Sequence, residues 1–258
     1  VSFAPGVYEI KATISGSNPK VIVYDSGPLT ITGNQALFFV PYAVGSSTLV
    51  NAMMLQSKGP TNRQNNLLAR VKTVQAAPGT GPVDLLQGGV PVITNVAYGG
   101  VGGYSNVPAK AAQVMGFAAT GTTTPTLAAV TSTLAPATDQ TIFITGFPGA
   151  QQAVVLNDLN LPAPDGNVKV RVVNASPNAG PITVTAAPSA TNTPLATGLP
   201  WPTASGYNFM AAGVYSFTVT DTGTGAQLLT IPDTLLTAPQ TTTIYVIGPA
   251  GTLSGVVT

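Results

Sequence analysis

The chain contains no cysteine and no histidine, and it has a single glutamate, Glu9. Without cysteine there is no disulfide framework, no thiolate nucleophile and no thiolate metal ligand. Without histidine there is no imidazole base, no Ser-His-Asp triad and no common zinc or haem ligand. The sequence therefore predicts a protein that is not an enzyme and that uses no cofactor or metal.

Charge of either sign is also scarce. Nine basic and eight acidic residues make up 7% of the 258 residues, against about 25% in an ordinary soluble domain. A net charge of +1 provides no basic surface for nucleic acid. So few Lys, Arg and Glu residues cannot cover the exposed faces of many soluble helices. We expect no nucleic-acid partner and an all-β fold without a helix longer than about two turns.

Long hydrophobic runs are absent too. The longest run, near residues 36–44, is interrupted by Pro41 and falls short of the roughly 20 residues of a transmembrane helix. The sequence from Val1 onward is typical of folded protein rather than of a signal peptide. A threonine-rich, cysteine-free composition with little charge favours an extracellular or cell-surface location. We expect no membrane-spanning segment.

Glycine (28 residues), proline (23 residues), threonine and valine are plentiful, and the apolar residues alternate along the chain. Val168, Val170 and Val172 alternate with Lys169 and Arg171, which places the two cations on the face opposite the valines. Such runs, bounded by turns, are typical of antiparallel β-sandwiches.

The chain contains an internal repeat. Residues 71–85 (VKTVQAAPGTGPVDL) and 170–184 (VRVVNASPNAGPITV) share the pattern V-[KR]-x-V-x-A-x-P-x-x-G-P-[VI]-x-[VL] without a gap. Matches of Pro and Gly at fixed spacing indicate two copies of one structural unit. We expect equivalent core positions for Val71 and Val170, Val74 and Val173, Val83 and Ile182, and Leu85 and Val184.

The start of the chain matches only the second half of this unit. FAPGVYEIKAT (3–13) parallels MAAGVYSFTVT (210–220), which aligns Gly6 with Gly213 and Tyr8 with Tyr215. The sequence thus predicts the C-terminal half of a first sandwich at 1–56, a linker at 57–66, a second sandwich at 67–156, a linker at 157–167 and a third sandwich at 168–258. We expect the half unit to be completed by residues outside this sequence or by strands from another subunit.

The motif VRVVNASPNAGPITV, a later Gly-Tyr pair and the strand AAGVYSFTV together resemble the domain-of-unknown-function family numbered 4397. The resemblance implies tandem immunoglobulin-like β-sandwich domains on bacterial secreted or envelope proteins, and it implies no activity. Where the family usually has a histidine, this chain has Gln75 and Asn174. That departure removes the one residue of the motif with catalytic chemistry.

A few residues are candidates for contacts or modification. Trp201, the only tryptophan, and Tyr98, at the related place in the second unit, are either ligand or partner contacts or packing anchors. Asn174 begins a glycosylation sequon that coincides with a turn. Three threonines in Thr/Pro-rich stretches, Thr123, Thr124 and Thr193, are candidate O-glycosylation sites.

Two functions fit these observations. The first is a structural cell-surface protein that assembles with copies of itself or with another envelope protein, with a filament as one form of the assembly, through sandwich edges and the incomplete first repeat. The second is an adhesion module that binds a glycan or a protein through loops such as the one containing Trp201.

Overall fold

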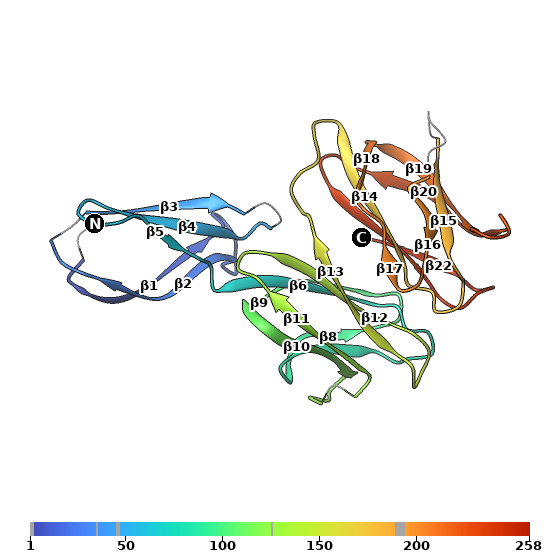
Figure 1. Ribbon diagram of the computed structural model, residues 1–258, viewed down its shortest axis with the longest axis horizontal. Coiled ribbons are helices and arrows are strands. Elements are labelled where there is room, and N and C mark those ends of the chain that lie inside the picture. Colours follow the sequence, from blue (N-terminus) through green and yellow to red (C-terminus); the bar gives the residue numbers. More distant parts are fainter. Residues whose placement is uncertain (1–2, 35, 45–46, 125, 189–193) are drawn as a thin grey trace.

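The computed structural model describes residues 3–34, 36–44, 47–124, 126–188 and 194–258. All regular elements in this part of the chain are β-strands, which confirms the all-β fold. The strands form three domains that follow one another along the chain (Figure 1). None of the described residues belongs to a helix that could span a membrane.

The first domain is small and has two sheets. A two-stranded sheet, β1-β2, lies opposite a three-stranded sheet, β3-β4-β5, and all pairs are antiparallel. The strands are β1 (Gly6–Thr13), β2 (Ile22–Ile31), β3 (Leu37–Ala43), β4 (Val50–Gln56) and β5 (Asn62–Gln64).

The second domain is a complete sandwich of two four-stranded sheets, β11-β10-β7-β8 and β13-β12-β6-β9. Its strands are β6 (Leu68–Gln75), β7 (Val83–Gln87), β8 (Val90–Val96), β9 (Val101–Pro108), β10 (Lys110–Ala119), β11 (Ala128–Leu134), β12 (Asp139–Thr145) and β13 (Gln152–Asp158).

The third domain repeats this plan, with one sheet in the order β16-β15-β19-β20 and another in which β14 joins β17 and β18 to β21 and β22. Its strands are β14 (Asn167–Asn174), β15 (Ile182–Ala187), β16 (Ala196–Leu199), β17 (Thr203–Ala204), β18 (Asn208–Ala211), β19 (Gly213–Asp221), β20 (Gln227–Leu236), β21 (Thr241–Ile247) and β22 (Ser254–Val257).

Each complete sandwich also contains one parallel pair, β6 with β12 and β14 with β21, which the sequence did not predict. A parallel pair needs a long crossover, and here the chain passes through the opposite sheet between the two paired strands. The period-two pattern alone cannot show the direction of a partner strand.

The repeat alignment places equivalent residues on equivalent strands. Three of the four predicted core pairs lie in the separate cores of the second and third domains: Val71 and Val170, Val83 and Ile182, and Leu85 and Val184. The fourth pair, Val74 and Val173, belongs to a third apolar cluster that lies between the two domains. The face of the sheet that carries Val74 or Val173 thus forms the contact between the second and third domains.

The predicted linker at 57–66 is held in place by the fold. β5 adds to β4, and the buried Asn66 amide Nδ2 donates hydrogen bonds to the carbonyls of Val23 (2.8 Å) and Val50 (2.9 Å). Asn66 therefore links strands from both sheets of the first domain to the beginning of β6.

Candidate functional site

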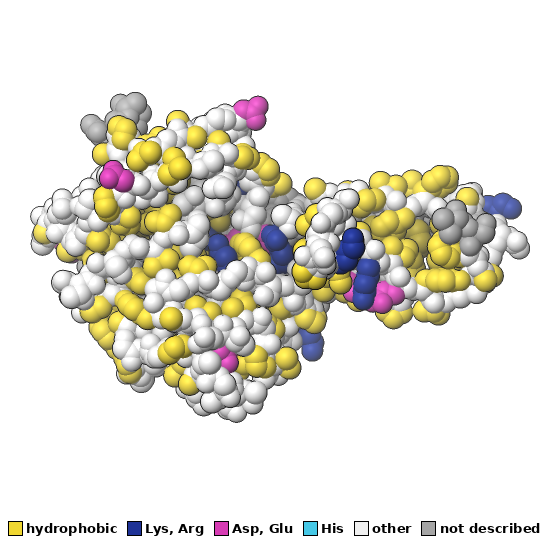
Figure 2. Space-filling model, turned by 180° about the vertical axis from the view of Figure 1, so that it is seen from behind, with side chains coloured by type: hydrophobic (Ala, Val, Ile, Leu, Met, Phe, Trp, Pro, Cys, Tyr) yellow, Lys and Arg dark blue, Asp and Glu magenta, His cyan; other side chains and the backbone are white. Residues whose placement is uncertain are grey.

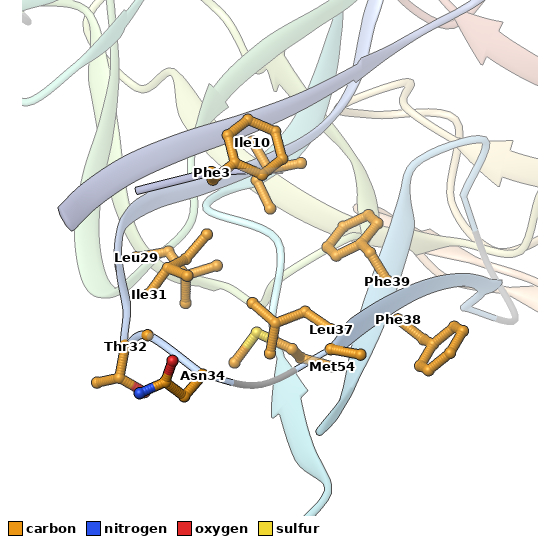
Figure 3. A pocket seen from close by; sticks show the side chains of 12 residues that line it. Phe3, Ile10, Leu29, Ile31, Thr32, Asn34, Leu37, Phe38, Phe39 and Met54 are labelled. Atoms are coloured by element: carbon orange, nitrogen blue, oxygen red, sulfur yellow. The ribbon is translucent and has the colours of Figure 1, made fainter. Parts of the chain in front are cut away.

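The first domain is open between its two sheets. A cavity of about 520 Å³ lies there, and Figure 3 shows Ile10 and Leu29 on one side of it, facing Leu37, Phe39 and Met54 on the other. In the complete third domain the place of Ile10 is taken by Phe217, which is fully buried. The described residues of the first domain include no counterparts of the strands that cover this position in the third domain.

The open cavity coincides with two free strand edges. In the described structure β1 pairs only with β2, and β3 pairs only with β4. Their counterparts in the complete domains are internal strands: β10 and β19 each have two neighbours, and so do β12 and β21. The equivalence of β1 and β19 also appears in side-chain detail, because the Tyr8 hydroxyl donates to the Ala4 carbonyl (2.7 Å) as the Tyr215 hydroxyl does to the Ala211 carbonyl (3.0 Å).

A second unusual place is the junction of the second and third domains, where six of the few charged residues meet. Two pairs form its centre. The Arg70 guanidinium donates through Nε and Nη2 to both oxygens of the buried Asp139 (2.8 and 2.6 Å), and Arg171 Nη2 donates to the buried Asp158 (2.6 Å). Figure 2 shows basic side chains near the middle of the molecule, between surfaces that are mostly apolar or uncharged.

Two tyrosines cover the cations at this junction in matching ways. The Tyr104 ring lies 4.6 Å from Arg70 Cζ and 5.1 Å from Lys72 Nζ, measured to its centroid. The Tyr207 ring lies in the same manner over Lys169 (5.6 Å) and Arg171 (4.8 Å). The sequence repeats a Gly-Tyr pair, Gly103-Tyr104 in the second domain and Gly206-Tyr207 in the third. Each domain thus supplies one tyrosine and two cations, and cation–π contact stabilises both sets.

The two acids have no such symmetry, since both come from the second domain. The Asp158 carboxylate accepts hydrogen bonds from the hydroxyls of Tyr104 and Thr141, both at 2.6 Å. Burial, followed by the charge of Asp158, raises the pKa of Tyr104. Burial also lowers the pKa of Lys72, against the opposing effect of Asp158. This network therefore stabilises a neutral tyrosine and places its two carboxylates between cations.

The two acids of the junction are engaged with neighbouring side chains. A cavity of about 430 Å³ opens beside Asp139 and Asp158, but both carboxylates already accept hydrogen bonds from arginine and from neighbouring side chains. Of the residues that the structure describes, no three or more acids lie together in a way that could hold a metal ion. Asp165, in the same predicted linker as Asp158, is exposed.

The structure places Trp201 and Tyr98 at equivalent positions on opposite sides of the same junction. Trp201, in the third domain, is half-buried, and its Nε1 donates to Thr145 Oγ1 of the second domain (3.2 Å). Tyr98, in the second domain, is more exposed, and its hydroxyl lies close to Gly248 of the third domain. Trp201 thus contacts the end of β12 in the second domain, and Tyr98 lies beside the end of β21 in the third domain.

The candidate glycosylation residues lie in different environments. Asn174 is fully buried: its Nδ2 donates to the carbonyls of Gly180 and Leu199 (both 3.0 Å), and its Oδ1 accepts from the Ser176 N–H. A glycan on Asn174 would have to be attached before the domain folds. Thr123 and Thr124 are exposed, and Thr193 lies outside the described residues. Glycosylation at all four positions stays a prediction.

Gln75, the counterpart of Asn174, makes the same type of contacts. Its Nε2 donates to the carbonyls of Thr80 and Gly81, and its Oε1 accepts from the Ala77 N–H. In both repeats a buried amide closes the turn that follows the first strand. The position is structural in this chain.

Sequence reasoning missed most of the junction. The alternation predicted correctly that Lys169 and Arg171 lie on the face opposite the valine core, yet both are buried because another domain covers that face. The repeated Gly-Tyr pair was the available signal, since a tyrosine repeated together with two cations indicates a repeated contact.

A protein-family model matches the middle of the chain. Residues 69–185 match the family model described as "Domain of unknown function (DUF4397)", which confirms the resemblance seen in the repeat motif. The match begins in β6 and ends in β15, so it includes almost all of the second domain and the first two strands of the third. No curated protein matches the chain.

Proposed function

We propose that this chain, whose residues 69–185 match the DUF4397 family model, is a non-enzymatic structural subunit of the bacterial cell surface or extracellular space. It assembles with further copies of itself, or with another envelope protein, through its first domain. The observation that carries the proposal is the open first sandwich, with its apolar cavity and the two strand edges, of β1 and β3, that have no partner among the described residues.

The first domain leaves backbone polar groups and apolar side chains exposed to water. An edge strand presents unpaired N–H and C=O groups that pair readily with another chain. The apolar side chains beside these edges gain free energy when a partner covers them. Charge is so sparse that it offers little repulsion between subunits.

The other two domains suit a stiff structural element. Their junction buries an apolar cluster that includes Val74, Phe143, Val173 and Tyr245, and the charged network borders it. Both strengthen the contact between the domains, so the two sandwiches should behave as one rigid body. A rigid pair of domains would hold neighbouring subunits at a fixed spacing in an assembly.

The alternative, an adhesion module, depends on a free aromatic platform. Trp201, its main candidate, is half-buried and bonded to Thr145 across the junction, which favours the packing interpretation. Adhesion would then have to use other loops. A glycan array tests it, and specific binding to an array would support adhesion over assembly.

Electron microscopy in negative stain tests the assembly proposal on the purified 258-residue chain. We expect fibres or ordered oligomers, and Ile10→Ser, which places a hydroxyl in the open cavity, should reduce their number. Val7→Ser, on the exposed outer side of the same strand, is the matched control and should leave them unchanged. Single particles at all concentrations would contradict the proposal.

A further inference from the structure

The first domain also exposes apolar side chains on the side of the β3-β4-β5 sheet that faces away from the cavity. Phe38 borders the cavity, but Figure 3 shows its ring on the opposite side of β3 from Phe39, and the residue is 61% exposed. Val40 is 44% exposed. Their cross-strand neighbours on β4 are Leu55 and Met53, which lie on the same face because directly paired residues point the same way. We call these four side chains the outer face of the first domain.

The corresponding face of the other two domains is a contact surface. On β12-β13 it carries the cross-strand pair Phe143 and Val154, and on β21-β22 it carries Tyr245 and Val256. These four residues pack together in the apolar cluster between the domains, with the rings of Phe143 and Tyr245 edge to face. The outer side of hairpin β12-β13 in the second domain thus packs against the outer side of the equivalent hairpin, β21-β22, in the third domain.

We propose that the outer face of the first domain docks against the same face of a second copy of this chain. The second and third domains cover each other's faces, so the first domain has no like partner among the described residues. When two identical faces meet, they form a contact with two-fold symmetry, to which each copy contributes the same residues. The inference rests on the proposed assembly role, and it names the surface that two copies share.

The apolar composition of the outer face suits another apolar face better than a charged partner. Among the residues of β3, β4 and β5, Arg63 alone is charged, and it lies opposite Met53 on the short outermost strand. Apolar pairs such as Phe38 with Leu55 gain by burial against another apolar face. A strongly acidic or basic partner would find little to bind here.

Along the free edge of β3, pairing with another strand is less favourable than packing on the outer face. Pro41 lies in the middle of β3 and has no N–H to donate, so it interrupts a ladder along that free edge. Face-to-face packing uses side chains alone and is unaffected by the proline. The two kinds of contact can also coexist, since they use different sides of β3.

The size of the face predicts a weak contact. Three strands of seven residues or fewer span roughly 14 by 24 Å, or about 340 Å² per partner. Stable complexes usually bury about 800 Å² per partner. We therefore expect association that depends on concentration in solution and becomes stronger when many copies are arrayed together.

Sedimentation equilibrium tests the inference on the full chain. The double variant Phe38→Ser/Val40→Thr should raise the dimer Kd at least about tenfold. The matched control is Val214→Thr/Leu235→Thr, a cross-strand pair in the third domain whose side chains are 53% and 69% exposed, and it should leave the Kd unchanged. Circular dichroism verifies that both variants fold.

Cross-linking gives a second, independent readout, because the chain has no cysteine of its own. A Val40→Cys variant should form a disulfide-linked dimer under mild oxidation, whereas Val214→Cys should remain largely monomeric. If the chain associates but Phe38→Ser/Val40→Thr changes nothing and Val40→Cys does not cross-link, this inference is wrong and the assembly role survives. If the chain stays monomeric up to about 1 mM, both are wrong.

Discussion

Phe143 of the second domain and Tyr245 of the third meet edge to face, with ring centroids 6.0 Å apart and planes inclined by 68°. The two residues occupy the same position in the repeat, because Phe143 pairs with Val74 as Tyr245 pairs with Val173. A single position of the repeat therefore supplies both halves of the contact. Its geometry is the favoured one for aromatic pairs.

Replacing Phe143 by alanine should lower the free energy of unfolding by about 3–5 kcal/mol, because the change leaves a cavity in a buried cluster. Since this cluster joins two domains, the variant should also unfold in two separate thermal transitions. Phe209→Ala, at an exposed position of β18, is the control and should have little effect. Calorimetry would contradict the account if the two variants behaved alike.

Replacing Arg171 by alanine should cost about 3–5 kcal/mol, because it leaves the carboxylate of Asp158 buried without its cation. Arg63→Ala, at an exposed position, should stay within about 0.5 kcal/mol of the parent. Urea unfolding followed by fluorescence or circular dichroism measures both. An equal cost for the two variants would show that the Arg171 pair is well solvated.

Alkaline pH should destabilise the protein. Burial raises the pKa of Tyr104 above that of an unfolded tyrosine, so above pH ~10 the unfolded chain loses this proton while the folded chain retains it. The contribution of Tyr104 is thus fully present below pH ~10 and is lost as the pH rises further.

The Tyr104→Phe variant isolates this contribution. It should be less stable at neutral pH, since the hydrogen bond to Asp158 is lost, and its stability should fall less steeply above pH ~10. Unfolding curves at a series of pH values make the comparison. Parallel pH profiles for the parent and the variant would mean that Tyr104 titrates normally in the fold.

Replacing Asn174 by alanine should cost about 1–3 kcal/mol, because buried backbone groups lose their hydrogen-bond partners. Gln75→Ala should have a similar cost in the second domain. Asn174→Asp should not restore stability, since a carboxylate cannot donate to the Gly180 and Leu199 carbonyls. Restoration by Asp would imply that accepting the Ser176 N–H is the important contact.

The fold was largely predictable because two physical patterns repeat along the chain. Alternation at period two identified the strands, and the spacing of Pro and Gly in the A-x-P turn identified the repeat. The two faces of β14 were also assigned correctly, with Val170 inside and Arg171 opposite. Alternation cannot reveal whether the second face meets water or another domain.

The junction itself could not be predicted for the same reason. Arg70 and Asp139 are 69 positions apart and meet only through the parallel register of β6 and β12. Trp201 and Tyr98 were recognised as related, but the strand end that each contacts belongs to the other domain. Contacts between domains depend on how finished sandwiches pack, and the short-range pattern contains no information on that packing.

The central claim is that the open first domain is the site of association. Amide hydrogen exchange, measured on the 258-residue chain over a concentration series together with its mass in solution, tests this claim most directly. We expect fast exchange in β1 and β3 at low concentration, and protection that grows as the mass rises above that of one chain. Slow exchange throughout residues 3–56 in a chain that stays monomeric would contradict the account.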